Sequence, residues 1–453
     1  MKSIRTLQSV VAAALLASGV LATLVGVTHT EVANAQSASK DAPKAPLETE
    51  TLRPEVAKLL KAAQDFINAK QFKEGLAKLN EADAITGKTA YEIYIQERLR
   101  GPAAAGAGET AVAVKSFQMA YETGRLNADE RIQFSEAIAV TQFQQKDFKA
   151  AALWSRRAIE NGSKSGQLKV IMIRALLLSD DFAAATKEID ASIREDQKVG
   201  RVPTQEMLLF ASTAAYKRSD DAAYINALEL LAVNYPSAEY WTDFIGRVAR
   251  SPNIAERYMS DIFRLKMTLG QPLTGAQYLF MAQTAKGAGF PIDATKIMDA
   301  GIAAGVLQTA EHKQFRDLVA KDAADDVKNM AKSSAEAAKA KEGPGLFNAG
   351  LNYVYNGESD KGLNMMEQGI RRPGIRRPED ARLRLGIAYA LAGEKAAAAE
   401  TLAAVKGTEG ATEVARVWTA YTAQKLAVAA TAPTAALSQP GSVAAPLKPA
   451  TTK

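Results

Sequence analysis

The sequence of 453 residues contains no cysteine, two histidines and few aromatic residues, which make up 7% of the chain and include three tryptophans. Without cysteine the chain cannot form a disulfide, a thiolate metal site or a thiol nucleophile, or carry a lipid on an N-terminal cysteine. Hydrophobic residues at 47% and charged residues at 23% are ordinary for a folded protein. The absences therefore restrict the chemistry of the chain rather than its ability to fold.

The one long apolar run lies at the start of the chain. Residues 10–27 are apolar, two basic residues precede them, and Ala33 and Ala35 occupy the positions that a signal peptidase reads. This layout predicts a signal peptide over residues 1–35, cleaved after Ala35, and Sec-type export to the periplasm of a Gram-negative bacterium. An uncleaved membrane anchor is the alternative, because the run is nearly long enough to span a bilayer. We expect no transmembrane segment after cleavage.

Both ends of the exported chain have the composition of unfolded segments. Residues 36–50 are mostly small and polar and contain proline, which predicts a flexible linker. Residues 426–453 consist largely of Ala, Thr and Pro without a periodic apolar face, which predicts a disordered tail. The folded part is therefore expected over residues 51–425.

Pairs of short amphipathic segments recur between these ends. The clearest pair covers residues 383–389 and 395–402, with Gly386 and Ala398 where two helices would approach closely. One position near the start of each second helix recurs along the chain, and a small residue holds it in all units but one: Gly75, Ala113, Ala151, Ala185, Tyr224, Ala294, Gly362 and Ala398. The successive intervals are 38, 38, 34, 39, 70, 68 and 36 residues, so each of the two long intervals holds about two periods.

The pattern Leu385-Gly386-x-x-Tyr389 followed by Ala398-x-x-x-Leu402 resembles the tetratricopeptide repeat (TPR). Over nearly the whole folded region the chain resembles the TPR superfamily, and in detail exported repeat proteins of proteobacteria that have no established function. The resemblance implies an all-α fold, a right-handed α-solenoid of about ten helical hairpins. Degenerate hairpins are expected in the two long intervals, around residues 240–265 and 312–341. Two unrelated helical domains are the alternative.

A TPR solenoid presents a concave groove lined by the first helix of each hairpin. A lining of amide, cationic and aromatic side chains suits an extended peptide or a helix, because amides bind main chain, cations bind carboxylates and aromatic rings provide contact area. The candidate groove residues, counted from the motif, are Gln64, Asn68, Phe143, Gln144, Arg174, Tyr216, Lys217, Gln283, Phe347 and Tyr355. Packing against neighbouring helices is the alternative role for each. The carboxylate clamp of chaperone-binding members is not reproduced.

A second candidate is an arginine-rich loop over residues 371–378. Its four arginines, Arg371, Arg372, Arg376 and Arg377, stand on a proline-stiffened segment and are candidates for binding phosphate, carboxylate or a glycan acid. The alternative is a solvated connection whose Pro378 opens the next helix. A nucleic acid is not expected as partner, because the net charge of +6 is modest for a chain of this length.

The remaining features favour structural roles. Aromatic residues between positions 235 and 244 suit packing at a distorted repeat, with a ligand site as the alternative. His312 has no second histidine or cysteine with which to form a metal site after cleavage, and the acidic residues at 322–326 lie in a helical segment rather than a calcium loop. Residues 101–108 lack the ending of a phosphate-binding loop. The sequence therefore predicts no catalytic residue, metal or cofactor.

These observations favour a non-enzymatic periplasmic scaffold that binds another envelope protein or peptide through its groove. One alternative is a cell-wall factor or the helical part of a glycan-acting system, because some peptidoglycan lytic transglycosylases carry a helical superhelix. Those enzymes place their catalytic acid in a further globular domain, for which residues 426–453 leave no room. A third alternative is that the arginine loop and the tail make weak contact with an anionic polymer of the envelope.

Overall fold

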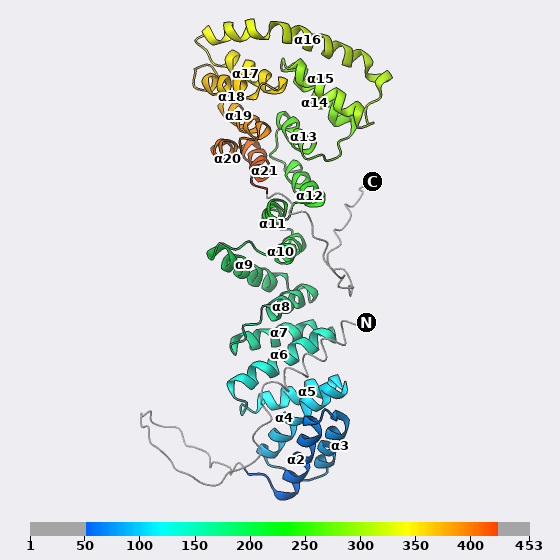
Figure 1. Ribbon diagram of the computed structural model, residues 1–453. Helices are drawn as coiled ribbons and strands as arrows, with labels where there is room; N and C mark the ends of the chain where they lie inside the picture. The colour runs from blue at the N-terminus through cyan, green and yellow to red at the C-terminus, as the bar shows by residue number, and fades with distance from the viewer. Residues whose placement is uncertain (1–50, 425–453) are drawn as a thin grey trace, which may run out of the picture. The chain divides into compact units, whose positions relative to one another are not determined.

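A computed structural model describes residues 51–424, which form twenty α-helices, one 3-10 turn and no strand (Figure 1). The fold is all-α and is built from helical hairpins in series, so the predicted fold class is confirmed. The predicted signal peptide, linker and tail lie outside the described residues. Within the described part, the chain divides into two compact units, the first ending at Ala191 and the second beginning at Ser192.

Unit 1 consists of four hairpins, and its last helix runs on into unit 2. The helices are α2 (Pro54–Asn68), α3 (Phe72–Asp83), α4 (Ala90–Ala107), α5 (Thr110–Glu122), α6 (Ala128–Gln144), α7 (Phe148–Glu160), α8 (Gly166–Leu178) and α9 (Phe182–Lys198).

Unit 2 contains five hairpins and two single helices, α16 and α21. Its elements are α10 (Gln205–Lys217), α11 (Asp221–Asn234), α12 (Ala238–Ala249), the 3-10 turn η1 (Glu256–Tyr258), α13 (Met259–Thr268), α14 (Gly275–Gly287), α15 (Pro291–Ala303), α16 (Thr309–Lys339), α17 (Pro344–Asn356), α18 (Ser359–Ile370), α19 (Pro378–Ala392), α20 (Lys395–Ala403) and α21 (Ala411–Ala423).

The turn inside the hairpin repeats its backbone conformation in eight of these hairpins. Its left-handed residue has a φ between 56° and 97° and is Lys70, Gly108, Lys146, Asp180, Ser219, Gly289, Gly357 or Gly393. Each lies five residues before the recurring position found in the sequence, as 70 precedes 75 and 393 precedes 398. The turns therefore reproduce the intervals of 38, 38, 34, 39, 70, 68 and 36 residues, and the predicted register is confirmed.

Local sequence signals explain where the helices begin. The Thr89 side chain accepts a hydrogen bond from the Glu92 amide while the Glu92 carboxylate accepts one from the Thr89 amide, and Asn127 and Glu130 repeat this capping box on α6. Proline occupies the first position of α2, α15, α17 and α19, where its missing N–H costs nothing.

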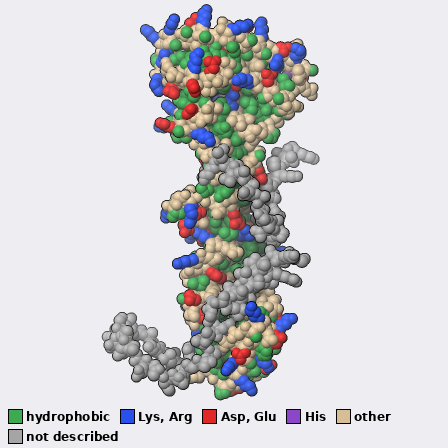
Figure 2. All heavy atoms as spheres, viewed as in Figure 1, with side chains coloured by type: hydrophobic (Ala, Val, Ile, Leu, Met, Phe, Trp, Pro, Cys, Tyr) green, Lys and Arg blue, Asp and Glu red, His purple; other side chains and the backbone are tan. Residues whose placement is uncertain are grey.

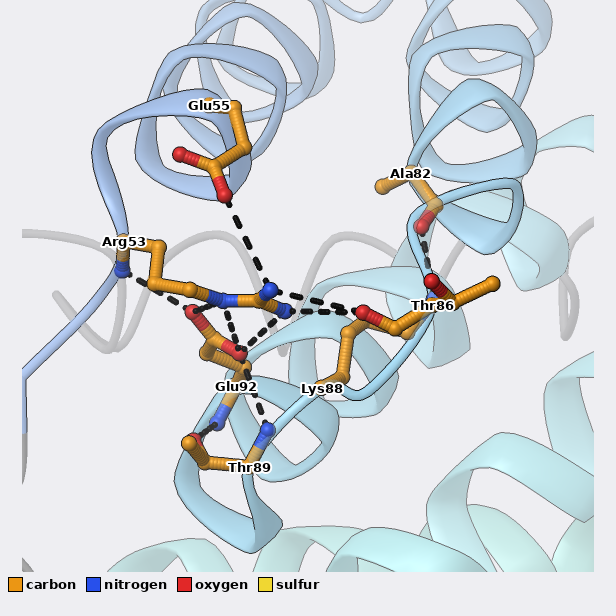
Figure 3. A network of polar contacts seen from close by, with 7 residues as sticks. All are labelled: Arg53, Glu55, Ala82, Thr86, Lys88, Thr89 and Glu92. Atoms are coloured by element: carbon orange, nitrogen blue, oxygen red, sulfur yellow. Dashed lines mark hydrogen bonds and ion pairs between the residues drawn. The ribbon is translucent and has the colours of Figure 1, made fainter.

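A buried carboxylate ties the start of unit 1 to its second hairpin (Figure 3). The Glu92 side chain has no solvent exposure and accepts hydrogen bonds from the Arg53 amide at 2.9 Å, from Arg53 Nε at 3.0 Å and from the Thr89 amide at 2.9 Å. The Arg53 guanidinium also donates to the carbonyl of Thr86 at 3.3 Å. The hydrogen bonds from Arg53 and Thr89 lower the pKa of Glu92 to about 2, although burial acts in the opposite direction.

The hairpin α17–α18 shows why small residues are needed where helices cross. A Cβ atom on Gly350 would lie 2.5 Å from the Gly362 carbonyl oxygen, and one on Gly362 would lie 2.5 Å from the Gly350 oxygen. About two turns further along α18, a Cβ on Gly369 would lie 2.6 Å from the Phe347 amide nitrogen. Three glycines thus bring the two backbones into contact.

Unit 2 closes on itself through its last helix. Helix α21 packs against α11, α12 and α13, which precede it by well over a hundred residues, and the Ala255 amide donates to the Glu409 carbonyl at 2.9 Å. Trp418 of α21 is fully buried, in one apolar cluster with Trp241 and Phe244 of α12. The chain of hairpins in this unit therefore returns to its own beginning, which the linear repeat pattern does not predict.

The hairpin expected over residues 312–341 is absent, and this prediction was wrong. The region forms one helix of 31 residues, α16, which lies across α15 and α17 (Figure 1). It buries Val319, Met330 and Ser334 and leaves most of its charged residues exposed. Residues 309–339 contain neither glycine nor proline, so nothing in this stretch breaks the helix. The other long interval does contain a hairpin, α12–α13, with a longer connection.

Candidate functional site

Unit 2 encloses a group of charged side chains, which we call the charged centre and define as Asp261, Arg264, Asp293, Tyr355 and Arg384. They come from four helices, α13, α15, α17 and α19. Arg264 contacts both Asp293 and the ring of Tyr355, and the charges of the other four residues act on the pKa of the Tyr355 hydroxyl. This region lies between two apolar clusters, because α13 and α19 contribute residues to both of them.

One pair in the charged centre is complete. Arg264 Nη1 donates to Asp293 Oδ1 at 2.9 Å and Arg264 Nη2 donates to Asp293 Oδ2, which is a bidentate pair. Arg264 is 7% exposed and Asp293 is 4% exposed. Burial acts to lower the pKa of Arg264, but the Asp293 carboxylate outweighs burial and raises the pKa above its usual value. The guanidinium also lies over the ring of Tyr355, 4.7 Å from its centroid.

Asp261 has no such partner. The residue is 7% exposed, and within the described chain its carboxylate takes part in no hydrogen bond or ion pair. Only its backbone carbonyl is bound, by the indole N–H of Trp418 at 3.1 Å. Burial raises the pKa of Asp261, and the positive charges of Arg384 and Arg264 act in the opposite direction.

Arg384 and the hydroxyl of Tyr355 are likewise without a bonded partner among residues 51–424. Arg384 is half-buried and forms no ion pair within 4.0 Å with a described carboxylate, although its charge acts on both Asp261 and Tyr355. Burial raises the pKa of the Tyr355 hydroxyl to about 12, so the phenol stays neutral and can donate a hydrogen bond. Of these three residues only Asp261 is buried, whereas Arg384 and Tyr355 are half-buried.

A second network of polar side chains stabilises the contact between the two ends of unit 2. Tyr258 donates its hydroxyl hydrogen to Asp380 Oδ1 at 2.6 Å, and Arg257 Nε donates to Asp380 Oδ2 at 3.1 Å. Arg257 also pairs with Glu409, so it joins η1 to the start of α19 and to the loop before α21. All of these groups have partners, which gives them a structural role.

The groove residues predicted in unit 1 differ in their surroundings. Asn68 and Gln144 end α2 and α6 and are exposed. The half-buried ring of Phe143 packs edge-on against Phe148 at 5.5 Å. Gln64 is buried at 8% exposure and Arg174 is half-buried, and both have interactions within the protein.

The groove residues predicted in unit 2 also differ in their solvent exposure. Tyr216 is 46% exposed and, with the exposed Lys217, ends α10; Gln283 on α14 is exposed. The prediction for Phe347 was wrong as a surface position, because its side chain is 5% exposed and its backbone meets Gly369. Tyr355 lies in the charged centre. The structure does not test whether any of these residues binds a ligand.

The arginines of the predicted anion loop have separate roles. Arg372 donates to the carbonyls of Ala337 at 3.2 Å and Ala340 at 2.8 Å, which satisfies the end of α16. Arg371 pairs with Glu367 at 3.2 Å, and Arg377 lies 3.9 Å from Asp380. Arg376 is exposed. On the face of unit 2 seen in Figure 2, basic and acidic side chains are interspersed rather than gathered into a field of one sign.

Tyr355 was predicted from the sequence as a groove residue, whereas no role was predicted for Asp261, Arg264, Asp293 and Arg384. Their only signal in the sequence is a charge inside an apolar stretch, as in Ile262-Phe263-Arg264-Leu265 and Leu383-Arg384-Leu385. Nothing in the sequence pairs them, because Arg264 and Asp293 are 29 positions apart and Asp261 and Arg384 are separated by 123.

Comparisons with known proteins identify no family by sequence. No family model matches the chain, and no curated protein matches it. Among solved structures, one of Naa15/Naa10 bound to HypK-THB is similar at 15% identity and a TM-score of 0.28, over 80% of this chain and 64% of that one. The TPR domain of P58(IPK) is similar at 12% identity and a TM-score of 0.22, over 81% of this chain and 98% of that one. These scores are too low to support an argument, so the fold rests on the hairpins themselves.

Two further findings concern the described residues alone. None of their helices combines the length and the apolar character that crossing a membrane requires. They also contain no cluster of three or more histidine, aspartate or glutamate side chains arranged to hold a metal ion.

Proposed function

We propose that this chain is an exported, non-enzymatic scaffold that binds another protein or a peptide of the cell envelope. Residues 1–35 support the export, since their layout is that of a cleaved signal peptide. The function is proposed for the folded part, residues 51–424, and its partner would bind along the ends of the first helices of the hairpins.

One observation carries the proposal: three of the first helices end at equivalent positions with an exposed polar side chain. Asn68, Gln144 and Lys217 are the last residues of α2, α6 and α10, each exposed and each two residues before a left-handed turn residue. The neighbouring Tyr216 keeps 46% of its surface exposed, although its ring lies 5.9 Å from that of Tyr224. Amides, a cation and an aromatic ring at a repeated position match what recognition of a peptide needs.

The test is crosslinking in living cells followed by affinity capture from the periplasmic fraction. The probe variants are Tyr216→Ala with Lys217→Ala in unit 2, and Asn68→Ala with Gln144→Ala in unit 1. Because the energy of an interface is concentrated in a few side chains, each pair is expected to reduce capture of a specific partner by about tenfold.

Matched controls separate recognition from a general loss of surface. Leu318→Ala on α16 removes an apolar side chain of similar exposure, 47% against 46% for Tyr216, from a helix outside the hairpins. Leu153→Ala on α7 serves unit 1, as its side chain is 49% exposed on a second helix. Equal capture by all variants would refute the proposed surface, and capture of glycan instead of protein would favour the cell-wall alternative.

The proposed location is tested separately. The N-terminal sequence of the protein recovered from cells is expected to begin at Gln36, and removal of residues 1–35 is expected to leave the protein in the cytoplasm. An intact Met1 on membrane-bound protein would instead establish the anchor.

A further inference from the structure

We propose that the partner of this scaffold binds unit 2 through an acidic segment that carries an aromatic side chain. The site is a patch that we call the tyrosine patch and define as Tyr216, Lys217, Tyr224, Arg247 and Arg250. It lies where the end of α10, the start of α11 and the end of α12 meet. The inference rests on the proposed function, since it names the chemistry of the partner at one of the helix ends proposed there.

The first step is that Tyr224 departs from the repeat. At the equivalent position the other seven hairpins carry glycine or alanine, which lets their two helices approach closely. Tyr224 is half-buried and packs against the apolar cluster of α11, α12 and α21. A large ring where the crossing needs a small residue does not improve the packing of the hairpin. The contribution of this residue therefore lies in the side chains that its ring contacts.

The second step is that the Tyr224 ring supports two side chains. The centroid of the Tyr216 ring lies 5.9 Å from that of Tyr224, and the Arg247 guanidinium lies 5.3 Å from the Tyr224 centroid. Asp221 accepts a hydrogen bond from Arg247 Nη2, which fixes the guanidinium beside the ring. Tyr216 is therefore held at the edge of the patch with 46% of its surface exposed. A ring positioned in this way can pack against an aromatic side chain of a partner at little cost in entropy.

The third step concerns the cations of the patch. Lys217 and Arg250 are exposed, and neither forms an ion pair or a side-chain hydrogen bond with any residue of the described range 51–424. A Cβ on Gly246 would lie 3.5 Å from Arg250 Nη1, so this side chain folds back along α12. The charge of Arg250 also acts on the pKa of the Tyr224 hydroxyl, which agrees with a position close to the ring.

The carboxylates near the patch are already bound or partly withdrawn from solvent. Asp221 pairs with Arg247, and Asp220 accepts a hydrogen bond from the Ala223 amide at 3.0 Å, which caps α11. Asp243 is half-buried, and burial raises its pKa although nearby arginines act in the opposite direction. The exposed charges that the patch leaves without a partner are therefore positive, and they complement an acidic segment.

The same charges argue against two other occupants. Residues 425–453 contain three lysines and no acidic residue, so the cations of the patch would repel them. A second copy of the chain that used the same patch in a twofold contact would bring like charges together. The observations therefore favour a different protein as the occupant.

The experiment begins with a selection that needs no knowledge of the partner. A displayed library of random peptides of about twelve residues is selected on the purified protein, and each selected peptide is then tested on Tyr216→Ala. Peptides that lose about tenfold or more in affinity on Tyr216→Ala are expected to be enriched in aspartate, glutamate and aromatic residues relative to the library. The tightest of them is the probe, and fluorescence anisotropy measures its affinity.

The decisive measurement exchanges charges between the probe and the protein. Replacing the acidic residues of the probe by lysine is expected to weaken its binding to the unaltered protein by at least about tenfold. Lys217→Glu combined with Arg250→Glu is expected to reverse this preference, so that the lysine version of the probe binds more tightly than the acidic one. A variant that has merely lost its fold cannot produce such a reversal.

Two further variants complete the design. Tyr224→Ala introduces the residue that most equivalent positions already carry, so the hairpin is expected to fold, which circular dichroism checks. It is expected to weaken the acidic probe by about tenfold, because Tyr216 and Arg247 lose the ring between them. Arg376→Glu is the control, since Arg376 is an exposed arginine outside the patch, and it should bind both probes as the unaltered protein does.

The proposal is overturned if no selected peptide depends on Tyr216, if the peptides that do so show no excess of acidic residues, or if the doubly reversed variant keeps its preference for the acidic probe. Capture from cells separates this failure from that of the scaffold function. A partner that is lost with Tyr216→Ala but kept by the doubly reversed variant would refute the acidic segment alone. Capture that neither variant changes would refute the surface itself.

Discussion

At the scale of single residues, the left-handed turn residues store strain in four hairpins. Lys146 has a φ of 65°, a conformation that costs a residue with a Cβ about 1–2 kcal/mol, while the greater freedom of glycine in the unfolded chain costs about 0.5–1 kcal/mol. Lys146→Gly is therefore expected to stabilise unit 1 by about 0.5–1 kcal/mol. Urea unfolding followed by the fluorescence of Trp154, in a background where the other two tryptophans are replaced by phenylalanine, measures this.

The reverse substitution is the control at the equivalent turn. A Cβ on Gly108 would meet nothing within 4 Å, so Gly108→Ala tests the backbone conformation alone and is expected to destabilise by about 1 kcal/mol. If neither variant moves the urea midpoint, the turns do not carry strain.

The buried carboxylate of Glu92 predicts a dependence on pH. Its pKa is about 2 in the folded protein against an ordinary value of 4.5, so its contribution to stability is fully present above pH 4.5 and is lost as the pH falls toward 2. Because the Arg53 side chain keeps 36% of its surface exposed, solvent screening limits the contribution to about 1–2 kcal/mol. Glu92→Gln is expected to lose this amount at pH 7 and to show a smaller further loss between pH 4.5 and pH 3.

The matched variant for this test is Glu55→Gln, since Glu55 also lies beside Arg53 at 3.7 Å but is exposed. It should leave both the stability at pH 7 and its dependence on pH unchanged. Equal effects of the two substitutions would assign the contribution to general surface charge.

At the scale of elements, the crossing of α17 and α18 is set by glycine. Gly350→Ala would place a Cβ 2.5 Å from the Gly362 oxygen, and backbone cannot move aside as a flexible side chain does, so we expect a loss of about 2–3 kcal/mol. Gly345→Ala, on the same helix, would meet only Ala337 at 3.8 Å and is expected to be neutral or slightly stabilising. Thermal unfolding of both variants compares them, and similar melting temperatures would mean that the two helices can separate without cost.

The same elements show what a sequence can predict. The hairpin register was predictable because close helix crossing admits only small residues, and positions such as Gly75 and Gly362 repeat wherever that crossing recurs. Helix α16 was misjudged because a doubled interval was read as two hairpins, although residues 309–339 contain no residue that breaks a helix. Phe347 was misplaced because the motif gives the helix but not the face that Gly369 approaches.

At the scale of the whole molecule, the closure of unit 2 was beyond prediction, and the charged centre depends on it. The repeat pattern describes contacts between neighbours in sequence, whereas α21 meets helices that precede it by well over a hundred residues. Trp418 connects this closing interface to Asp261 of α13. Its indole is buried in the interface and donates a hydrogen bond to the Asp261 backbone carbonyl at 3.1 Å. The packing around Asp261 therefore depends on the last helix.

Trp418→Ala tests this dependence. Removing a fully buried tryptophan leaves a large cavity and is expected to cost about 3–5 kcal/mol in unit 2. Hydrogen exchange followed by mass spectrometry should show faster exchange in α11–α13 and α21, while α4–α7 keep their protection because unit 1 has an apolar cluster of its own. Thr412→Ala, an exposed position on the same helix, should change neither. Faster exchange throughout α2–α21 would mean that the two units unfold as one, and unchanged exchange in α11–α13 would mean that α21 does not hold unit 2 closed.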